Sequence, residues 1–206
     1  MSTHLDDYKL NHNDEYARGK RKEENMKPAG ILMIEHRLIE KVLLLVDREI
    51  ERIEERLAID KHFLKSVVDF IRTYADKIHH GKEEDILFEQ LKAKAMDAHD
   101  TAVMAELDEE HVVARRVVSE LVQAETGYFS GDRPQIEVVK QKLAFLVNFY
   151  PVHIAKEDKD FFPKTQRYFT AEELDRMLEE FRVFDSGWDK EKYSRLYETM
   201  KAELEK

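Results

Sequence analysis

The sequence contains no cysteine, and this absence excludes a whole group of structures and chemistries. Disulfide bonds, thiolate zinc sites, iron–sulfur clusters and cysteine nucleophiles all require that side chain. A metal site in this chain would therefore have to use histidine and carboxylate ligands.

Glycine and proline are scarce too, with 6 glycines and 4 prolines in 206 residues. Folds rich in β-turns use both residues often, so their scarcity, together with 38% charged residues, favours long helices. The chain is long enough for one sizeable core, with residues left over for terminal appendages.

Long apolar runs are missing as well, and no segment approaches the roughly 20 apolar residues of a membrane span. Residues 1–26 are polar and do not resemble a signal peptide. The formal net charge of -10 disfavours phosphate binding, which uses clustered lysine and arginine. We therefore expect a cytoplasmic protein that binds neither a membrane nor nucleic acid.

Apolar residues after Pro28 recur at the spacing of long amphipathic helices. Four long helices are predicted, the second capped by Asp60 and the third by Asp100 or Thr101, with a possible bend at Gly81. The predicted fold is all-α, an antiparallel up-down four-helix bundle over 27–166. A flexible polar arm over 1–26 precedes it, and a helical extension over 167–206, begun by a capping box at Thr170, packs on it.

A repeated motif is the strongest functional signal. The segments HHGKEEDILF (79–88) and HIAKEDKDFF (153–162) both read His-x-x-Lys-Glu-acid-x-x-apolar-Phe. In a helix a residue four positions on lies about 6 Å further along the same face, so each histidine and its glutamate point the same way. Two such pairs are what a two-metal site in a helical bundle requires.

Four histidines fall on the four predicted long helices, each beside core-facing apolar positions: His36, His79, His111 and His153. A lone core histidine is more often bonded to a backbone carbonyl, but four in one core need several partners. Imidazole and carboxylate ligands suit iron, manganese or zinc, and this set is larger than one structural zinc ion needs. His4, His12, His62 and His99 are expected at the surface or in structural roles.

The chain resembles the hemerythrin-like (HHE cation-binding) family over about 28–165. The residues that carry the resemblance are, in order along the chain, His36, His79-His80-x-x-Glu83, His111 and His153-x-x-x-Glu157. The resemblance implies a four-helix bundle with two non-haem iron ions, bridged by two carboxylates and an oxo or hydroxo group. It makes the four histidines named above terminal ligands, and Glu83 and Glu157 the bridges.

The third helix departs from the family pattern, because Leu107 stands where oxygen-carrying members have a second histidine. His80 is the candidate replacement, although neighbouring helical residues diverge by about 100°. Asp158 competes with Glu157 as the last carboxylate, since members of the family space that pair by five residues; the internal repeat favours Glu157. Tyr150, one turn before His153, is a candidate neighbour of the site.

The resemblance implies a protein that binds or senses a small oxidant such as dioxygen, nitric oxide or peroxide. Whether it is an enzyme, with peroxide- or oxygen-dependent redox activity, stays open. The alternatives are iron storage or donation for the repair of iron centres, and a metal-free helical interaction module. A ferritin-like di-iron site is a further rival, because Asp76 and Asp108 each precede a histidine by three residues.

Overall fold

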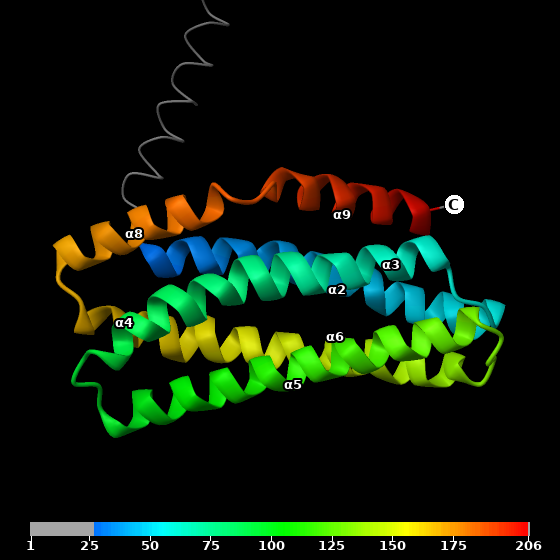
Figure 1. The fold of residues 1–206 in the computed structure, drawn as a ribbon, viewed down its shortest axis with the longest axis horizontal. Helices are drawn as coiled ribbons and strands as arrows, with labels where there is room; N and C mark the ends of the chain where they lie inside the picture. Colours follow the sequence, from blue (N-terminus) through cyan, green and yellow to red (C-terminus); the bar gives the residue numbers. More distant parts are fainter. Residues whose placement is uncertain (1–26, 206) are drawn as a thin grey trace, which may run out of the picture.

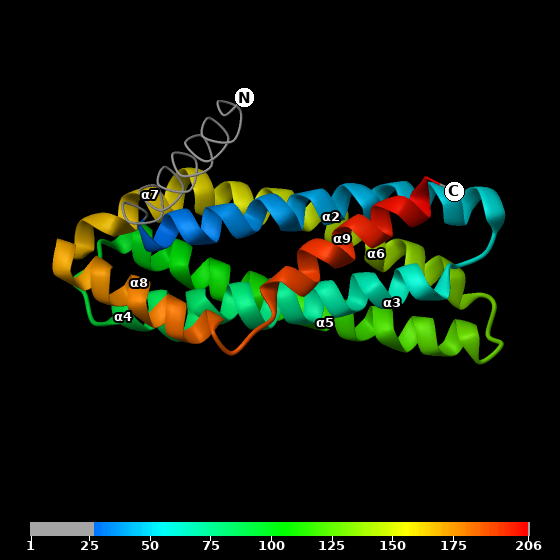
Figure 2. The same cartoon turned by 90° about the horizontal axis from the view of Figure 1, so that it is seen from above.

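The computed structural model describes residues 27–205, so the predicted arm with His4 and His12 lies outside the described residues. Within that part the chain is helical and contains no strand, which confirms the all-α prediction. Four long helices lie side by side in alternating directions (Figures 1 and 2).

The four long helices follow one another with short connections. The first is α2 (Pro28–Arg56), and the third is α5 (Ala98–Phe129). The second long helix consists of α3 (Lys61–Asp69), η1 (Phe70–His80), η2 (Glu83–Phe88) and α4 (Glu89–Lys92). The fourth consists of α6 (Gln135–Lys156), η3 (Glu157–Phe161), α7 (Phe162–Thr165) and the 3₁₀ turn η4 (Gln166–Tyr168).

Side chains at the helix starts explain most of these boundaries. Pro28 lies in the first turn of α2, and Asp60 accepts hydrogen bonds from the backbone of His62 and Phe63. The predicted cap of α5 was wrong. Asp97 is the cap, because its side chain accepts a hydrogen bond from the Asp100 amide at 2.9 Å.

Three segments, η1, η2 and η3, are wound with i→i+5 hydrogen bonds, the π-helical pattern that often accompanies functional sites. The segments η2 and η3 lie within the two copies of the repeat, and η1 ends at the first two residues of the first copy. Gly81 lies between η1 and η2 and keeps ordinary helical dihedral angles, so no left-handed conformation requires a glycine there. A side chain at Gly81 would instead meet the Phe184 ring, 2.8 Å from the position of its Cβ.

Two further helices, α8 (Ala171–Asp185) and α9 (Lys190–Leu204), pack on α2 and on the second long helix (Figures 1 and 2). The capping box of Thr170 and Glu173 starts α8, as predicted. These helices cover one side of the bundle, whereas the side formed by α5 and α6 has no such cover within residues 27–205.

Two apolar clusters fill the bundle, and polar residues separate them along each long helix. One cluster includes Leu32, Phe88 and Leu107, and the other includes Ile39, Ala114 and Tyr150. The buried histidines of the four helices lie between these clusters. None of the described helices has the length and apolar character needed to cross a membrane.

Candidate metal centre

All seven predicted ligand residues are buried, and they converge in two groups between the apolar clusters. The first group is His36, His79, Glu83 and Glu157, and the second is His80, His111 and His153. Within each group, one nitrogen or oxygen atom per residue lies within 4.8 Å of those of the others. Each group could hold one metal ion.

The two glutamates reach both groups. For Glu83, Oε1 lies 3.2 Å from Nε2 of His79, and Oε2 lies 3.5 Å from Nε2 of His111. For Glu157, Oε2 lies 3.1 Å from Nε2 of His36, and Oε1 lies 3.4 Å from Nε2 of His153. Each carboxylate therefore offers one oxygen to either group, as a bridge between two cations would.

Several buried polar atoms at this point have no hydrogen-bond partner among residues 27–205: Nε2 of His36 and His79, Nδ1 of His80, and both oxygens of Glu83 and Glu157. Proteins rarely bury such atoms unpaired, because each costs about 1–3 kcal/mol. A pair of cations between the groups would satisfy the oxygens and the Nε2 atoms together. The residues present therefore fit a two-metal site.

The outer nitrogens of four histidines are held by carboxylates in a closed ring. Each long helix supplies one acid to a histidine of the next helix, and the fourth supplies one to the first. An ionised carboxylate only accepts hydrogen bonds, so Nδ1 of each histidine carries the proton and donates it. The other ring nitrogen, Nε2, is then free of a proton and faces the centre. The bonds are His79–Glu35 at 3.0 Å, His111–Glu84 at 2.7 Å, His153–Glu110 at 2.8 Å and His36–Asp158 at 2.8 Å.

The lysine of the repeat completes this arrangement. Lys82 bonds Glu35, the carboxylate that holds His79. In the second copy Lys156 bonds Glu110 at 2.6 Å, and Glu110 holds His153. Each lysine thus fixes the carboxylate that orients the histidine of its own copy.

The ionisation of these groups follows from their partners. Burial alone would raise the pKa of Glu35, but the hydrogen bond from His79 and the charges of Lys82 and Lys190 lower it to about 2. Burial would lower the pKa of His79, yet Glu83 and Glu35 raise it to about 10. Because metal ligation needs the free imidazole nitrogen, a cation bound here must displace a proton.

His80 differs from the other four histidines. Its Nδ1 lies 3.6 Å from the nearest carboxylate oxygen, that of Asp76, too far for a hydrogen bond. Burial and the charges of His111 and His79 lower its pKa well below the usual value. Its ring stacks on that of His111 with centroids 3.8 Å apart.

Sequence reasoning left two questions about the ligand set, and the geometry bears on both. An i→i+5 helix has more than 3.6 residues per turn, so consecutive residues diverge by less than about 100° and both His79 and His80 face the centre. Asp158 points to the outer nitrogen of His36 and to Arg37, whereas the buried Glu157 points inward. Leu107 lies in an apolar cluster beside the centre.

The remaining candidates do not belong to the two groups, although Tyr150 and Asp76 are neighbours of His80. His62 and His99 are exposed, and His99 lies 3.2 Å from Asp160. Tyr150 is buried, with its ring centroid 6.4 Å from those of His80 and His153. Asp76 accepts a hydrogen bond from Arg115.

The outer role of the ring carboxylates was missed in the sequence, where only Asp158 was considered and then as a rival bridge, although a signal was present. Glu35 and Glu110 directly precede His36 and His111, and Glu84 and Asp158 directly follow the two inner glutamates. An acid therefore adjoins a candidate ligand on every long helix. Lys190, which joins Glu35 from α9, had no such signal.

The hemerythrin HHE cation binding domain matches residues 27–165, which include both groups and all of the four long helices except the last turn, η4. The chain belongs to this family. Similar curated proteins, described as uncharacterized, occur in Mycobacterium bovis and in two strains of Mycobacterium tuberculosis, each 25% identical over 150 residues. The match covers 73% of this chain but only 58% of each relative. No solved structure matches the chain significantly.

Proposed function

We propose that this HHE domain holds two non-haem iron ions and uses them to bind or sense a small oxidant. His36 and His79 would hold one ion, His80, His111 and His153 the other, and Glu83 and Glu157 would bridge them. The observation that carries the proposal is the placement of both glutamates. Their four buried oxygens lack hydrogen-bond partners among residues 27–205 and face histidines of both groups.

Iron fits the donor set better than a single structural zinc ion does. A set of five imidazoles and two carboxylates without a thiolate suits iron or manganese, and exceeds the four ligands of a structural zinc ion. Bound iron would supply a redox-active centre for dioxygen, nitric oxide or peroxide. The protein's part is to orient five imidazoles, to hold the bridges, and to keep bulk water away through the flanking apolar clusters.

Metal analysis and an absorption spectrum of the aerobically purified chain test this proposal. We expect two iron ions per chain and the charge-transfer bands of an oxo-bridged pair. His79→Ala and Glu157→Ala should lose iron and the bands. The matched controls His62→Ala and Glu109→Ala change exposed residues of the same types and should keep both.

A colourless protein that takes up no iron after anaerobic ferrous reconstitution would contradict the proposal. Two manganese or zinc ions per chain would keep the two-metal site but reject iron. Reduced protein exposed separately to dioxygen, nitric oxide and peroxide then identifies the ligand from the spectral change that each one causes.

A further inference from the structure

The C-terminal helices meet the first copy of the repeat at the junction between α8 and α9 (residues 185–190). The ring of Phe184, which directly precedes this junction, lies 2.8 Å from the position that a Cβ of Gly81 would take. Asp185 accepts a hydrogen bond from Lys82 at 2.7 Å. Both contacts fall inside the motif that carries the candidate ligands. Since α8 and α9 lie beyond the matched residues 27–165, they belong to the chain's own extension of the HHE domain.

A series of charged side chains then connects the junction with a candidate ligand. Lys190, the first residue of α9, donates to Glu35 at 2.5 Å and to Asp185 at 2.7 Å. Glu35 also accepts the hydrogen bond from Nδ1 of His79, at 3.0 Å. Lys82 pairs with both acids. The junction is therefore linked through one carboxylate to an imidazole whose other nitrogen faces the centre.

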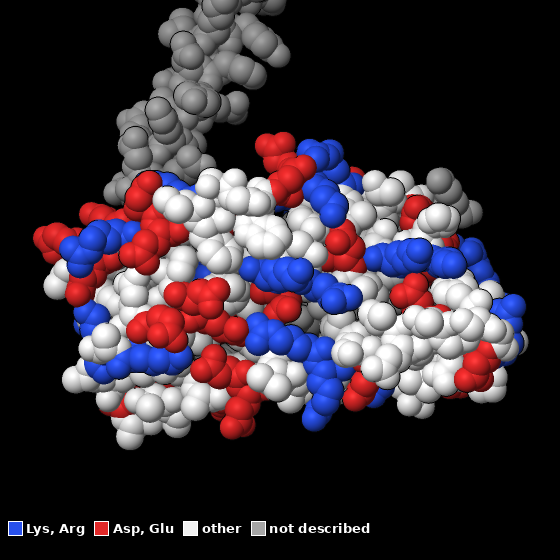
Figure 3. Space-filling model, viewed as in Figure 1, with Lys and Arg blue, Asp and Glu red and all other residues white. Residues whose placement is uncertain are grey.

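Burial distinguishes these contacts from ordinary surface pairs. Charged side chains of both signs are scattered over the face of the molecule in Figure 3, and exposed pairs of this kind hold their partners weakly. The side chain of Glu35 is only 3% exposed, and that of Lys82 is 0% exposed. A charge buried so deeply must stay paired, so a displacement of the Glu35 carboxylate is passed on to its partners.

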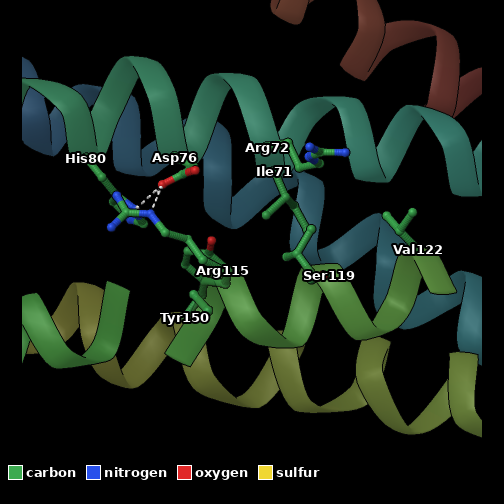
Figure 4. Close-up of a pocket in the computed structure, with 10 residues that line it drawn as sticks. Ile71, Arg72, Asp76, His80, Arg115, Ser119, Val122 and Tyr150 are labelled. Carbon is green, nitrogen blue, oxygen red and sulfur yellow. Dashed lines mark hydrogen bonds and ion pairs between the residues drawn. The ribbon is translucent and has the colours of Figure 1, made fainter. Parts of the chain in front are cut away.

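The second group of candidate ligands has no comparable connection among residues 27–205. In the second copy of the repeat, Lys156 and Glu110 orient His153 on the side of the bundle that α8 and α9 leave uncovered. His80 makes no hydrogen bond through Nδ1 with the described residues, and it borders a cavity between η1 and α5 whose lining includes Arg115 (Figure 4). Within this part of the chain, the C-terminal helices are therefore linked to the first group.

Apolar contacts keep the two helices on the bundle independently of this link. Met177 and Phe181 of α8 and Tyr193 and Met200 of α9 are at most 3% exposed. Their burial stabilises the docked helices whatever the state of the centre. A change at the centre would therefore tighten or loosen the junction rather than release α8 and α9.

We propose that metal occupancy of the first group and the packing of the α8–α9 junction stabilise each other through Glu35, with Lys190 as a positioning residue. When Nε2 of His79 ligates a cation, the ring is fixed and its Nδ1 holds Glu35 more firmly. By linkage, a well-packed junction raises the affinity for the cation by the same factor. The C-terminal helices thus report the state of the centre. This inference rests on the proposed metal site, but not on iron as the metal.

Trp188 allows the effect of the metal on the junction to be measured in the full chain. It is the single tryptophan, its side chain is 36% exposed, and its amide donates to the Asp185 carbonyl at 3.0 Å. Zinc is the probe, because it has no redox chemistry. We expect zinc to lower the acrylamide quenching of Trp188 in the wild type and to leave it unchanged in Lys190→Met. Lys192→Met removes an exposed pair on the same helix and should keep the wild-type response.

A second control separates this link from a general effect of metal binding. Lys156→Met removes the corresponding lysine of the second copy and should also keep the response of Trp188 to zinc. An equal response in the wild type and in Lys190→Met, with two zinc ions bound to each, would contradict the coupling while leaving the metal site intact. A wild-type chain that takes up no metal would reject the proposed function, and this inference with it.

Competition with a chelator tests the coupling in the other direction. Lys190→Met should weaken the retention of one of the two ions by about tenfold, the lower end of the range for outer contacts, because Lys190 acts through Glu35. Lys190→Arg keeps the charge and should restore most of the loss, and Lys192→Met should release both ions as the wild type does. A loss shared equally by both ions would mean general destabilisation and would overturn the positioning role of Lys190.

Discussion

The bundle consists of two helical hairpins that carry the same chemistry at different depths. In the first, α2 and the second long helix supply Lys82, Glu35 and His79; in the second, α5 and the fourth long helix supply Lys156, Glu110 and His153. The side chain of Lys82 is 0% exposed, whereas that of Lys156 is 19% exposed. The repeat therefore determines which groups pair, and the surroundings determine how deeply the pair is buried.

The difference comes from the C-terminal helices. Asp185 of α8 and Lys190 of α9 add a second acid and a second base to the Lys82–Glu35 pair, with Lys190 2.5 Å from Glu35 and 2.7 Å from Asp185. The second hairpin has no such cover among residues 27–205. One half of the centre is thus covered by α8 and α9, while surface hollows reach the other half at His80 and at His153.

The largest contrast is expected when the same acid is neutralised in each hairpin. Glu35→Gln leaves two lysines against Asp185 alone in an enclosed site, and should lower the free energy of unfolding by about 3–5 kcal/mol. Glu110→Gln affects a side chain that is 21% exposed, against 3% for Glu35, and should cost about 1 kcal/mol or less. Urea unfolding of the metal-free proteins, prepared with a chelator, measures both losses of stability. Equal losses in the two variants would contradict the distinction between the hairpins.

The pH dependence of stability tests the contribution of the Glu35 carboxylate within the first hairpin alone. The pKa of Glu35 falls from 4.5 to about 2 on folding, so its stabilising contribution is present above pH 4.5 and is lost as the pH falls through about 2. That contribution is roughly 3 kcal/mol. The difference in the free energy of unfolding between metal-free wild type and metal-free Glu35→Gln should therefore shrink as the pH falls from 4.5 to 2. A constant difference over that range would show that the Glu35 carboxylate is not the source.

A smaller effect is expected at the outer carboxylates that hold the histidines. Asp158→Asn should weaken metal retention by about 10–100-fold, because Asp158 orients the enclosed His36. Glu84→Gln acts on His111 and should cost less, since Glu84 is more exposed than Asp158. Competition with a chelator measures both losses. A larger loss for Glu84→Gln would mean that depth does not govern the strength of the outer contacts.

The sequence predicted the parts of this site that a helical period can express. Histidine and glutamate four residues apart share a helix face, so both copies of the motif were visible as ligand pairs, and the four long helices were visible as apolar stripes. The ring of outer carboxylates depends on how each helix is rotated toward the next, which no single stripe specifies. The i→i+5 winding near His79 leaves no clear local signal. Asp97, Asp100 and Thr101 are all residue types that favour a helix cap, so the sequence does not choose among them.

The smallest expected effect concerns the attachment of the C-terminal cover. Lys190→Met removes a partly buried link between α9 and Glu35 and should lower the free energy of unfolding by about 1 kcal/mol. Lys192→Met removes an exposed pair with Asp69 and should cost less than about 0.5 kcal/mol. Trp188, the single tryptophan, lies between α8 and α9, so its quenching by acrylamide reports loosening of this junction. Stronger quenching in Lys190→Met than in Lys192→Met would show that the buried Lys190–Glu35 contact holds α8 and α9 on the bundle. The reverse result would show that the surface pair of Lys192 and Asp69 holds them.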